Sequence, residues 1–432
     1  MIDRLKKEKK IEQTYKTRII ALVHRHDSVF QTCLWANGPC RLPALKLQLK
    51  EDVTDFGKTY LRKYSDEQKA AIDKELDNLV KAGILKDSLT DICSPVHCVA
   101  KKRNKSTGEI EWRLVCAMQK INSKLVTMKH PLRNIPSLIQ GLKGTKYMFC
   151  TDLYKMYWRM RLDKDSQHLC GIMTHRGVYV WTRCPMGLKN SGSWCDKQMH
   201  TLFRHQEGII SWVDDVLVYA PTMELLVKRI EIFLAIAKKW NITINPDKTT
   251  LACTEAVYLG HKISERGIGC DPAKIRALQD MRTPPHAGAL YSFVSACGWL
   301  RSNIVKYTQK IAPLQDLLTE LLKAAKKRTK KAASKINLKP HWKAEHEKAF
   351  QAIKDDLSNT ITLSYLQADH FAVICVDASL KHWPGICTQV PESQRLRPPS
   401  EMDHSILATH SGTFKHAQVN YSVMDKECVG LV

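Results

Sequence analysis

Two adjacent carboxylates, Asp214 and Asp215, stand between two short apolar runs. The runs, 209–213 and 216–219, are rich in β-branched and aromatic residues, which favour buried strands. We therefore expect a β-hairpin with the acidic pair at its tip. Neighbouring carboxylates repel each other unless a cation lies between them, so the pair is a candidate metal ligand. Plain turn chemistry is the alternative, but tight hairpin turns favour Asn-Gly or Asp-Gly, and neither occurs here.

A third carboxylate, Asp152, ends another apolar run that begins at Tyr147. Phosphoryl transfer by two divalent ions needs carboxylates that converge from separate elements. The interval between Asp152 and Asp214 can hold the strands and helices that would bring the two aspartates side by side in one sheet. This arrangement is typical of the palm of a nucleotidyltransferase.

An ordered series of motifs resembles the reverse transcriptases of LTR retrotransposons, most closely the gypsy type, from about residue 29 to the end. The three central motifs are Asp152-Leu153 with Tyr157, the segment Pro185–Asn190, and Val213–Asp215. Each motif alone is common, whereas the whole series in the family's order is specific. The other matching segments are Lys58–Tyr60, Arg62–Ser65, Gly83–Leu85, Ser94–Val96, Lys101-Lys102, Trp112-Arg113, Lys120–Asn122, Asn245–Lys248, Tyr258–Ser264, Val376–Ser379 and Tyr421–Glu427.

The resemblance implies an α/β (α+β) fold: right-hand polymerase fingers, palm and thumb, followed by an incomplete ribonuclease H-like domain. It implies an RNA-directed DNA polymerase in which a primer 3′-hydroxyl attacks a deoxynucleoside triphosphate with the help of two Mg²⁺ ions, for which Mn²⁺ can substitute. The expected partners are an RNA or DNA template with its primer and deoxynucleoside triphosphates. The alternative is a decayed or co-opted fragment that binds nucleic acid without catalysis.

The resemblance also assigns roles around the metal ions. Asp152, Asp214 and Asp215 would hold the ions, together with the carbonyl oxygen of Leu153. Lys248 would protonate pyrophosphate as it leaves; a solvated lysine beside a proline turn is an equal alternative.

Further residues would bind the nucleotide and the primer. Tyr157 would exclude a ribose 2′-hydroxyl, although without the family it would be read as a core aromatic residue. Phosphates favour ammonium and guanidinium groups, as Lys102 and Arg113 could provide. The remaining assignments are Met186 and Gly187 near the new base pair, Tyr258, Leu259, Gly260 and His261 in the primer grip, and Asp377 and Glu427 in the ribonuclease H part. His261 is equally well read as a structural histidine.

Several positions depart from the family pattern. The family usually carries an Asp and an Arg where this chain has Ala117 and Gln119. Met156 replaces a common Gly, Trp212 a common Tyr, and Asp196 a common Gln. The change at 117 and 119 bears on template positioning and supports the non-catalytic alternative.

Composition agrees with a nucleic-acid enzyme. A net charge of +24 over 432 residues favours a polyanionic partner and salt-dependent binding. The 15 cysteines include no C-x-x-C pair, so we expect reduced thiols and a cytoplasmic or nuclear location, with virus-like particles as the family's setting. No apolar run is long enough to span a bilayer, so we expect neither secretion nor a membrane partner. The oligomeric state is left open.

Composition and motifs together suggest five parts. These are a basic N-terminal lead-in (1–50), fingers and palm (51–255), a thumb (256–320), a basic connector (321–341) and a truncated ribonuclease H-like domain (342–432). Ribonuclease H chemistry in this family uses four carboxylates, and the sequence up to Val432 contains two of them, Asp377 and Glu427. We therefore expect this sequence not to cleave the RNA of an RNA·DNA hybrid.

Local signals place several helices. We expect one over residues 11–24, a second opened by Ser65 with its end near Gly83, and a third opened by Asp271-Pro272. Asn190 should cap a fourth helix. The apolar stripe of the second helix should contain Ile72, Leu76, Leu79 and Val80, and that of the fourth Trp194, Cys195, Met199, Leu202 and Phe203.

Overall fold

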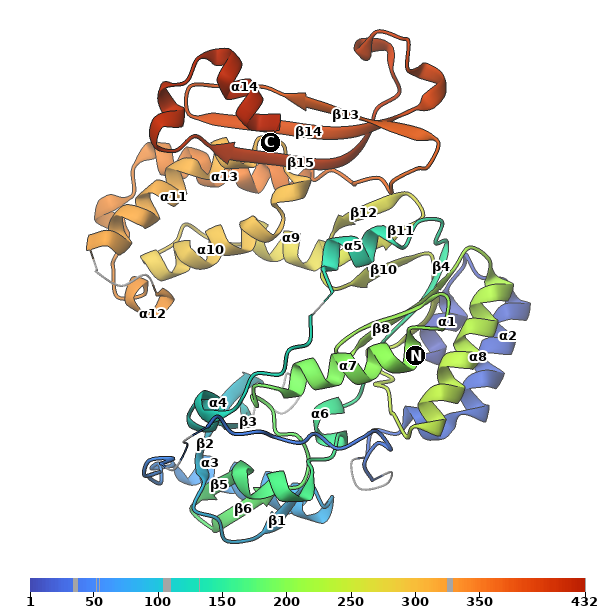
Figure 1. The fold of residues 1–432 in the computed structure, drawn as a ribbon, viewed down its shortest axis with the longest axis vertical. Coiled ribbons are helices and arrows are strands. Elements are labelled where there is room, and N and C mark those ends of the chain that lie inside the picture. The colour runs from blue at the N-terminus through green and yellow to red at the C-terminus, as the bar shows by residue number, and fades with distance from the viewer. Residues whose placement is uncertain are drawn as a thin grey trace. The chain divides into compact units, whose positions relative to one another are not determined.

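The computed structural model divides the chain into two compact units (Figure 1). The first unit comprises Met1–Asn134 and Thr145–Thr254, and the second comprises Ile135–Gly144 and Glu255–Val432. The residues that the structure describes are 1–33, 38–51, 53, 55–103, 110–131, 133–324 and 329–431.

A four-stranded antiparallel sheet lies at the centre of the first unit, in the order β7-β8-β4-β9. Strand β8 pairs on both sides, and its Val216, Leu217 and Val218 are fully buried. The ring of Phe233 packs against Phe149 and Phe203, with centroids 5.5 and 5.7 Å apart. These elements are β4 (Tyr147–Asp152), β7 (Ile209–Trp212), β8 (Asp215–Ala220), β9 (Thr250–Cys253), α6 (Met156–Arg159), α7 (Ser191–Phe203) and α8 (Met223–Lys239).

A second sheet of the first unit has five strands in the order β1-β6-β5-β2-β3. Helix α3 begins, as expected, with a capping box in which Ser65 and Gln68 bond each other's backbone N–H groups. The buried apolar stripe of α3 is narrower than expected, because the side chain of Val80 is 42% exposed. The elements are α3 (Asp66–Lys81), β1 (Leu85–Asp87), β2 (Cys93–Arg103), β3 (Ile110–Cys116), α4 (Gln119–Lys124), β5 (Gly171–Thr174) and β6 (Gly177–Trp181).

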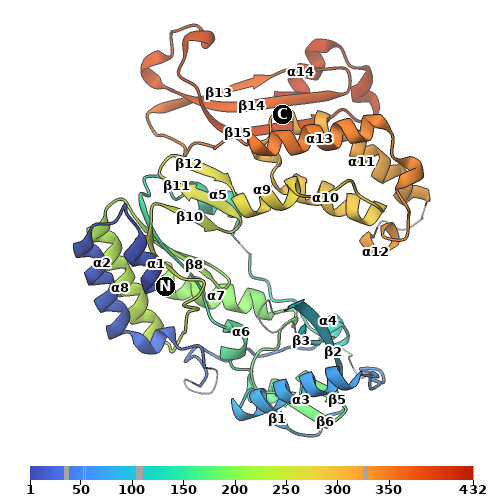
Figure 2. The same ribbon diagram turned by 180° about the vertical axis from the view of Figure 1, so that it is seen from behind.

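The N-terminal segment packs onto the central sheet's helices. Helices α1 (Ile2–Lys7) and α2 (Gln13–Arg25) belong to the first unit, and α2 lies beside α8 in both ribbon views (Figure 2). Arg18 and Arg25 form ion pairs with Glu224 and Glu231 of α8. The basic segment that we expected as a lead-in is therefore built into this unit.

The second unit combines two three-stranded sheets with a group of helices. The sheets have the orders β10-β11-β12 and β13-β14-β15, and the rings of Phe293 and Phe350 pack 4.6 Å apart in the helical core. The bounds are α5 (Ile135–Gln140), β10 (Glu255–Tyr258), β11 (His261–Ser264), β12 (Gly267–Cys270), α9 (Pro272–Gln279), α10 (Ala287–Trp299), α11 (Tyr307–Ala324), α12 (Lys330–Ala333), α13 (Ala344–Ser358), β13 (His370–Val376), β14 (His382–Pro391), β15 (Ser405–Thr413) and α14 (Val423–Leu431).

The expected connector, 321–341, is partly helical. Helix α11 continues into it with Leu321 and Leu322 buried, and α12 follows. Residues 325–328, which include Lys326, Lys327 and Arg328, lie outside the described residues. The connector as a separate part therefore stays a prediction.

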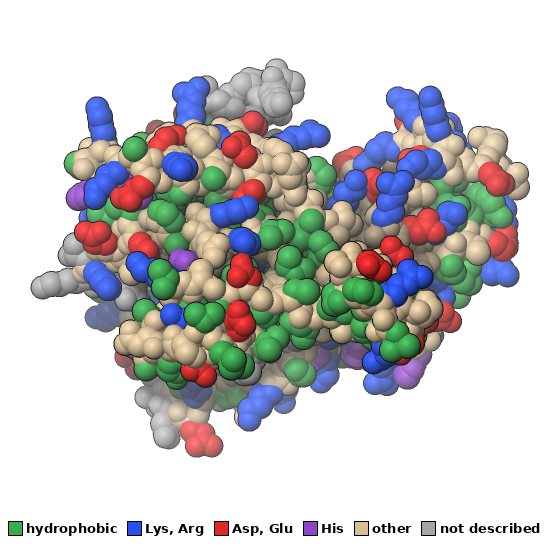
Figure 3. All heavy atoms as spheres, turned by 90° about the horizontal axis from the view of Figure 1, so that it is seen from above, with side chains coloured by type: hydrophobic (Ala, Val, Ile, Leu, Met, Phe, Trp, Pro, Cys, Tyr) green, Lys and Arg blue, Asp and Glu red, His purple; other side chains and the backbone are tan. Residues whose placement is uncertain are grey.

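The surface of the last sheet carries exposed apolar side chains. Ile374 of β13 is 56% exposed, and Val423 and Met424 of α14 are 68% and 76% exposed. Figure 3 shows hydrophobic side chains among Lys and Arg on the surface seen from above.

All 15 cysteines are unpaired thiols, and no helix in the described ranges is long and apolar enough to cross a membrane.

The turn between β11 and β12 depends on Gly267. Its φ is +139°, and a Cβ placed there would collide with the backbone oxygen of Leu363. Leu363 and Ile268 exchange two backbone hydrogen bonds of 2.8 Å, so the obstructing backbone is fixed. Gly177, with φ +133°, has the same backbone region but nothing within 4 Å of such a Cβ.

We predict that Gly267→Ala destabilises its unit by about 1 to 3 kcal/mol more than Gly177→Ala destabilises the first unit. Both substitutions strain φ, but only Gly267→Ala adds overlap with backbone that cannot rotate away. Thermal or urea unfolding of each variant measures the difference. Equal losses would show that Leu363 can move aside.

Candidate active site

The acidic pair lies at a hairpin, as the sequence predicts. Strands β7 and β8 pair in a register that places Trp212 opposite Asp215, so Val213 and Asp214 form a two-residue turn. Val213 has φ +54°, which is rare for a β-branched residue and costs on the order of 1 to 3 kcal/mol. The positive φ that glycine usually supplies in such turns is here imposed on valine.

Asp152 lies beside this hairpin because β4 pairs antiparallel with β8. Asp152 and Asp215 are direct partners across the two strands. The backbone N–H of Leu153 donates to the carbonyl of Asp214 at 2.8 Å, and the N–H of Asn245 donates to the carbonyl of Asp152 at 2.9 Å. The backbone at each end of the acid group is therefore held by neighbouring strands and loops.

Burial and neighbouring negative charge raise the pKa of Asp214 and of Asp215. Burial, followed by the charge of Asp152, raises the pKa of Asp214. Burial, followed by the charges of Asp214 and Asp152, raises the pKa of Asp215 to about 6. The ammonium of Lys248, 3.0 Å from the Oδ2 of Asp152, opposes both shifts. The site thus holds more negative charge than its own residues neutralise.

The side chains do not form a preorganised metal cage. Among the described residues, no group of three or more His, Cys, Asp or Glu side chains is arranged to hold a metal ion. Asp214 is in the turn and Asp215 in the strand, and neighbouring positions of a strand face opposite ways. Even so, unneutralised carboxylate oxygens suit a hard divalent cation.

A cavity of about 480 Å³ brings many of the predicted residues together. Asp152, Leu153, Tyr157, Asp214 and Lys248 line it, as do Arg113 and Met186. Asp215 and Gly187 are not among its lining residues, and the side chain of Lys102 lies outside the described residues.

Among the lining residues that we did not assign, three have an amide or charged side chain. Asn245 belongs to a segment recognised in the sequence, so its motif could have identified it. Lys155, with φ +46°, comes just before α6, and its Nζ lies 4.9 Å from the centre of the Trp158 ring. Glu75 comes from α3, and no local pattern links it to the acids.

Tyr157 is partly buried in α6. Gly192 of α7 lies next to it, and a Cβ placed on Gly192 would make an ordinary van der Waals contact of 3.7 Å with the Tyr157 hydroxyl. Burial, followed by nearby Cys195 and Asp214, raises the pKa of Tyr157. The hydroxyl of Tyr157 therefore stays protonated beside the acids. The ring lines the cavity, where a nucleotide sugar could reach it.

The segment before α7 is held by two asparagines. Asn122 donates to the carbonyl of Gly187 at 2.8 Å and accepts from the N–H of Lys189 at 2.8 Å. Asn190 precedes α7, but its side chain does not cap the helix as we expected. It bonds the backbone of Val126 and Met128 instead, because those groups lie within its reach after folding.

Ala117 and Gln119 both follow strand β3 and do not lie on it. Strand β3 ends at Cys116, Ala117 donates its N–H to Pro95, and Gln119 begins α4. Because the two positions are not on one strand, an Asp and an Arg placed there would not share one face of a strand.

The expected primer-grip residues form a second tight hairpin in the other unit. Tyr258 pairs with His261, and the turn residues Leu259 and Gly260 have φ +49° and +79°. Burial, followed by the charge of Lys274, lowers the pKa of His261. Their role in gripping a primer stays a prediction.

The two ribonuclease H candidates are both exposed. Asp377 follows β13, and its Oδ2 lies 3.5 Å from Lys306 Nζ; Glu427 is in α14, which packs on β13 and β14.

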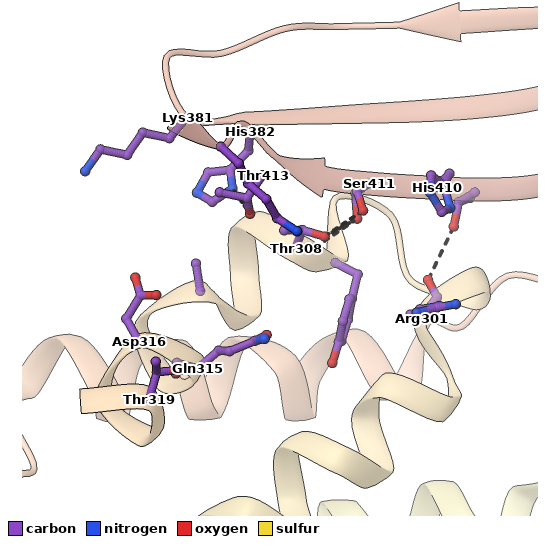
Figure 4. A pocket seen from close by; sticks show the side chains of 14 residues that line it. Arg301, Thr308, Gln315, Asp316, Thr319, Lys381, His382, His410, Ser411 and Thr413 are labelled. Carbon is purple, nitrogen blue, oxygen red and sulfur yellow. Dashed lines mark hydrogen bonds between the residues drawn. The ribbon is translucent and has the colours of Figure 1, made fainter. Parts of the chain in front are cut away.

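A larger cavity of about 580 Å³ lies between α11 and strands β14 and β15 (Figure 4). There the hydroxyls of Thr308 and Ser411 lie 2.8 Å apart. Asp316 is the only carboxylate among its described lining residues, so this cavity lacks the acid group that two-metal chemistry requires.

Two parts of the chain match known protein families. Residues 100–263 match the family described as reverse transcriptase (RNA-dependent DNA polymerase), and residues 342–432 match the RNase H-like domain found in reverse transcriptase. The Pol polyprotein of transposon 412 from Drosophila melanogaster is 26% identical over 388 residues, covering 89% of this chain and 29% of that protein. That of transposon gypsy, from the same organism, is 26% identical over 365 residues, covering 84% and 33%. The chain thus spans about a third of these relatives.

Solved structures share the fold. The foamy viral protease-reverse transcriptase in complex with an RNA/DNA hybrid has a TM-score of 0.82 and 20% identity, covering 99% of this chain and 53% of that one. The same enzyme with dsDNA gives 0.81 and 21%, covering 99% and 83%. The expected polymerase fold with an RNase H-like domain is confirmed.

We predict that Asp215→Asn stabilises the metal-free protein at neutral pH. The folded-state pKa of about 6 exceeds the ordinary 3.8, so the folded state binds more protons between these values. Stability contributed by this group therefore falls as pH rises through that window. Because the carboxyl is partly exposed, we expect a gain on the order of 1 kcal/mol above pH 6 and almost none at pH 4.

Thermal unfolding in a chelator, from pH 4 to 8, tests this. Asp165→Asn, at an exposed acid of the same unit, is the control. A gain of equal size at every pH would contradict the assigned cause.

Proposed function

We propose that this chain, which belongs to the reverse transcriptase family of retroelement Pol polyproteins, copies an RNA or DNA template into DNA. The observation that carries the proposal is the single cavity lined by Asp152, Asp214, Tyr157, Arg113 and Lys248. Two acids, an aromatic ring and two cations are the groups that a nucleoside triphosphate and its metal ions would need.

The acids fit divalent ions in charge and donor type. Asp152 and Asp214 would hold Mg²⁺ or Mn²⁺, with Asp215 contributing negative charge from its neighbouring position. Bound ions would supply charge stabilisation to the attacking and leaving oxygens of the phosphoryl transfer. The raised pKa values of Asp214 and Asp215 support this, because a cation would relieve the repulsion that causes them.

The cations of the cavity would serve the triphosphate. Arg113 is exposed on β3 and can present a guanidinium fork to phosphate oxygens. Lys248 is 62% exposed yet tied to Asp152, which keeps its ammonium near the reacting groups as a proton donor to pyrophosphate. Asp152 thereby positions Lys248.

The partners follow from fold and charge. The foamy viral enzyme has been solved with an RNA/DNA hybrid and with dsDNA, and this chain shares its fold and carries a net charge of +24. We propose a primed RNA or DNA strand as partner, held by salt-sensitive phosphate contacts.

We expect Asp152→Asn or Asp214→Asn to reduce primer extension by more than about 100-fold, since each removes a carboxylate from the cavity. Binding of primer–template should not weaken, because a carboxylate repels phosphate and contributes no attraction to it. Extension on a primed RNA homopolymer with Mg²⁺ and a filter-binding assay measure the two quantities. A wild-type chain that binds but never extends would favour the non-catalytic alternative.

Tyr157→Val should admit ribonucleotides. The valine side chain is shorter than the ring, so the space for a 2′-hydroxyl opens and selectivity for deoxyribonucleotides should fall by about 10- to 100-fold. Single-nucleotide incorporation of dNTP and rNTP gives the ratio. Tyr154→Val, at a neighbouring lining tyrosine, is the matched control; an unchanged ratio in Tyr157→Val would assign Tyr157 to the core.

A further inference from the structure

A buried aspartate of α7 contacts the strained hairpin turn. Asp196 is fully buried, and its Oδ1 accepts from the backbone N–H of Val213 at 3.2 Å. The preceding residue, Cys195, donates its thiol to the carbonyl of Val213 at 3.4 Å. Consecutive residues of one helix thus bind the N–H and the C=O of Val213.

Two cationic or polar side chains complete the group. The Nη2 of Arg133 donates to Asp196 Oδ1 at 3.2 Å and also donates to the carbonyl of Ser211, on the strand that enters the turn. The Nε2 of His130 lies 3.0 Å from Asp196 Oδ2. Although burial raises the pKa of Asp196, the hydrogen bonds from His130 and Val213 and the charge of Arg133 lower it overall. The carboxylate is thus kept ionised in the interior.

Val213, whose backbone is bonded by Cys195 and Asp196, is also the strained residue of the turn, and it directly precedes Asp214. A turn residue at φ +54° returns to an ordinary conformation unless its surroundings hold it. Any relaxation of Val213 would rotate the next peptide and move the Asp214 carboxylate relative to Asp152. The contacts of Asp196 oppose that rotation at the point where it would begin.

We propose that Asp196 is a positioning residue that holds the hairpin turn in the conformation that presents Asp214 to the cavity. This role rests on the part of the proposed function that makes Asp214 a metal-binding carboxylate. Among the described residues, the carboxylate of Asp196 bonds His130, Arg133 and Val213, and none of these three lines the cavity. Asp196 also differs from the glutamine that the family commonly has here. The carboxylate fits this chain because His130 and Arg133 supply matching donors.

Two variants separate the acceptor from mere bulk. Asp196→Ala removes every acceptor, whereas Asp196→Asn keeps one oxygen for Val213 and Arg133. Loss of such an outer contact typically weakens metal binding or activity by about 10- to 100-fold. We expect that loss in Asp196→Ala, and a clearly smaller one in Asp196→Asn.

The test uses the full chain and three measurements. Mn²⁺ titration followed by electron paramagnetic resonance gives the dissociation constant, with Asp214→Asn as the reference for a lost ligand. Hydrogen–deuterium exchange of peptides covering 209–220 reports on the hairpin without metal or substrate. Primer extension gives the rate. Leu234→Ala, at a fully buried position of α8, controls for general loss of stability.

We expect Asp196→Ala to bind Mn²⁺ more weakly and to exchange faster at the hairpin, while Leu234→Ala leaves Mn²⁺ affinity unchanged. Equal Mn²⁺ affinity and equal hairpin exchange in Asp196→Ala and Leu234→Ala would overturn the proposal. Should Asp196→Ala fail to fold, the double variant Arg133→Met, Asp196→Ala removes the unpaired cation and gives the same readouts. If Mn²⁺ affinity responds as expected but the wild-type chain extends no primer, the polymerase function fails and the positioning role stands.

Discussion

The antiparallel pairing of β4 with β8 is the constraint on which the candidate site depends. It places Asp152 opposite Asp215 and brings the hairpin turn beside the end of β4. The repulsion that results is tolerated because the strands are fixed by a core in which Val216, Leu217 and Val218 are fully buried. Burial of apolar side chains in the sheet therefore offsets the cost of gathering like charges at the ends of its two central strands.

Much of the site was predictable because strands and turns leave local signals. Two runs rich in β-branched and aromatic residues on either side of an acidic pair indicated the hairpin, and Asp152 at the end of another apolar run indicated its neighbour. The capping signals at Ser65 and Asp271 were also confirmed, since a cap depends on residues only a few positions away.

The parts that sequence could not supply depend on contacts between distant segments. Asn190 has the right type for a cap, yet it bonds the backbone near residue 127, which only the fold brings close. Asp214 lines the cavity and Asp215 does not, since Asp214 lies in the turn and Asp215 in β8, and that division depends on the register in which the strands pair. The positive φ of Val213 carries no sequence signature, because valine is the residue least expected there.

Helix α7 joins two properties of the site through one short stretch of backbone. Gly192 lies next to the Tyr157 hydroxyl, and Cys195 and Asp196 bond the backbone of Val213 about one turn further along. A shift of the helix start would therefore disturb the surroundings of Tyr157 and the geometry of the hairpin together. Substitutions at these positions should show epistasis, so the tolerated amino acids at each depend on those at the others. Variation along this helix is constrained as a set, and its members can change safely only in concert.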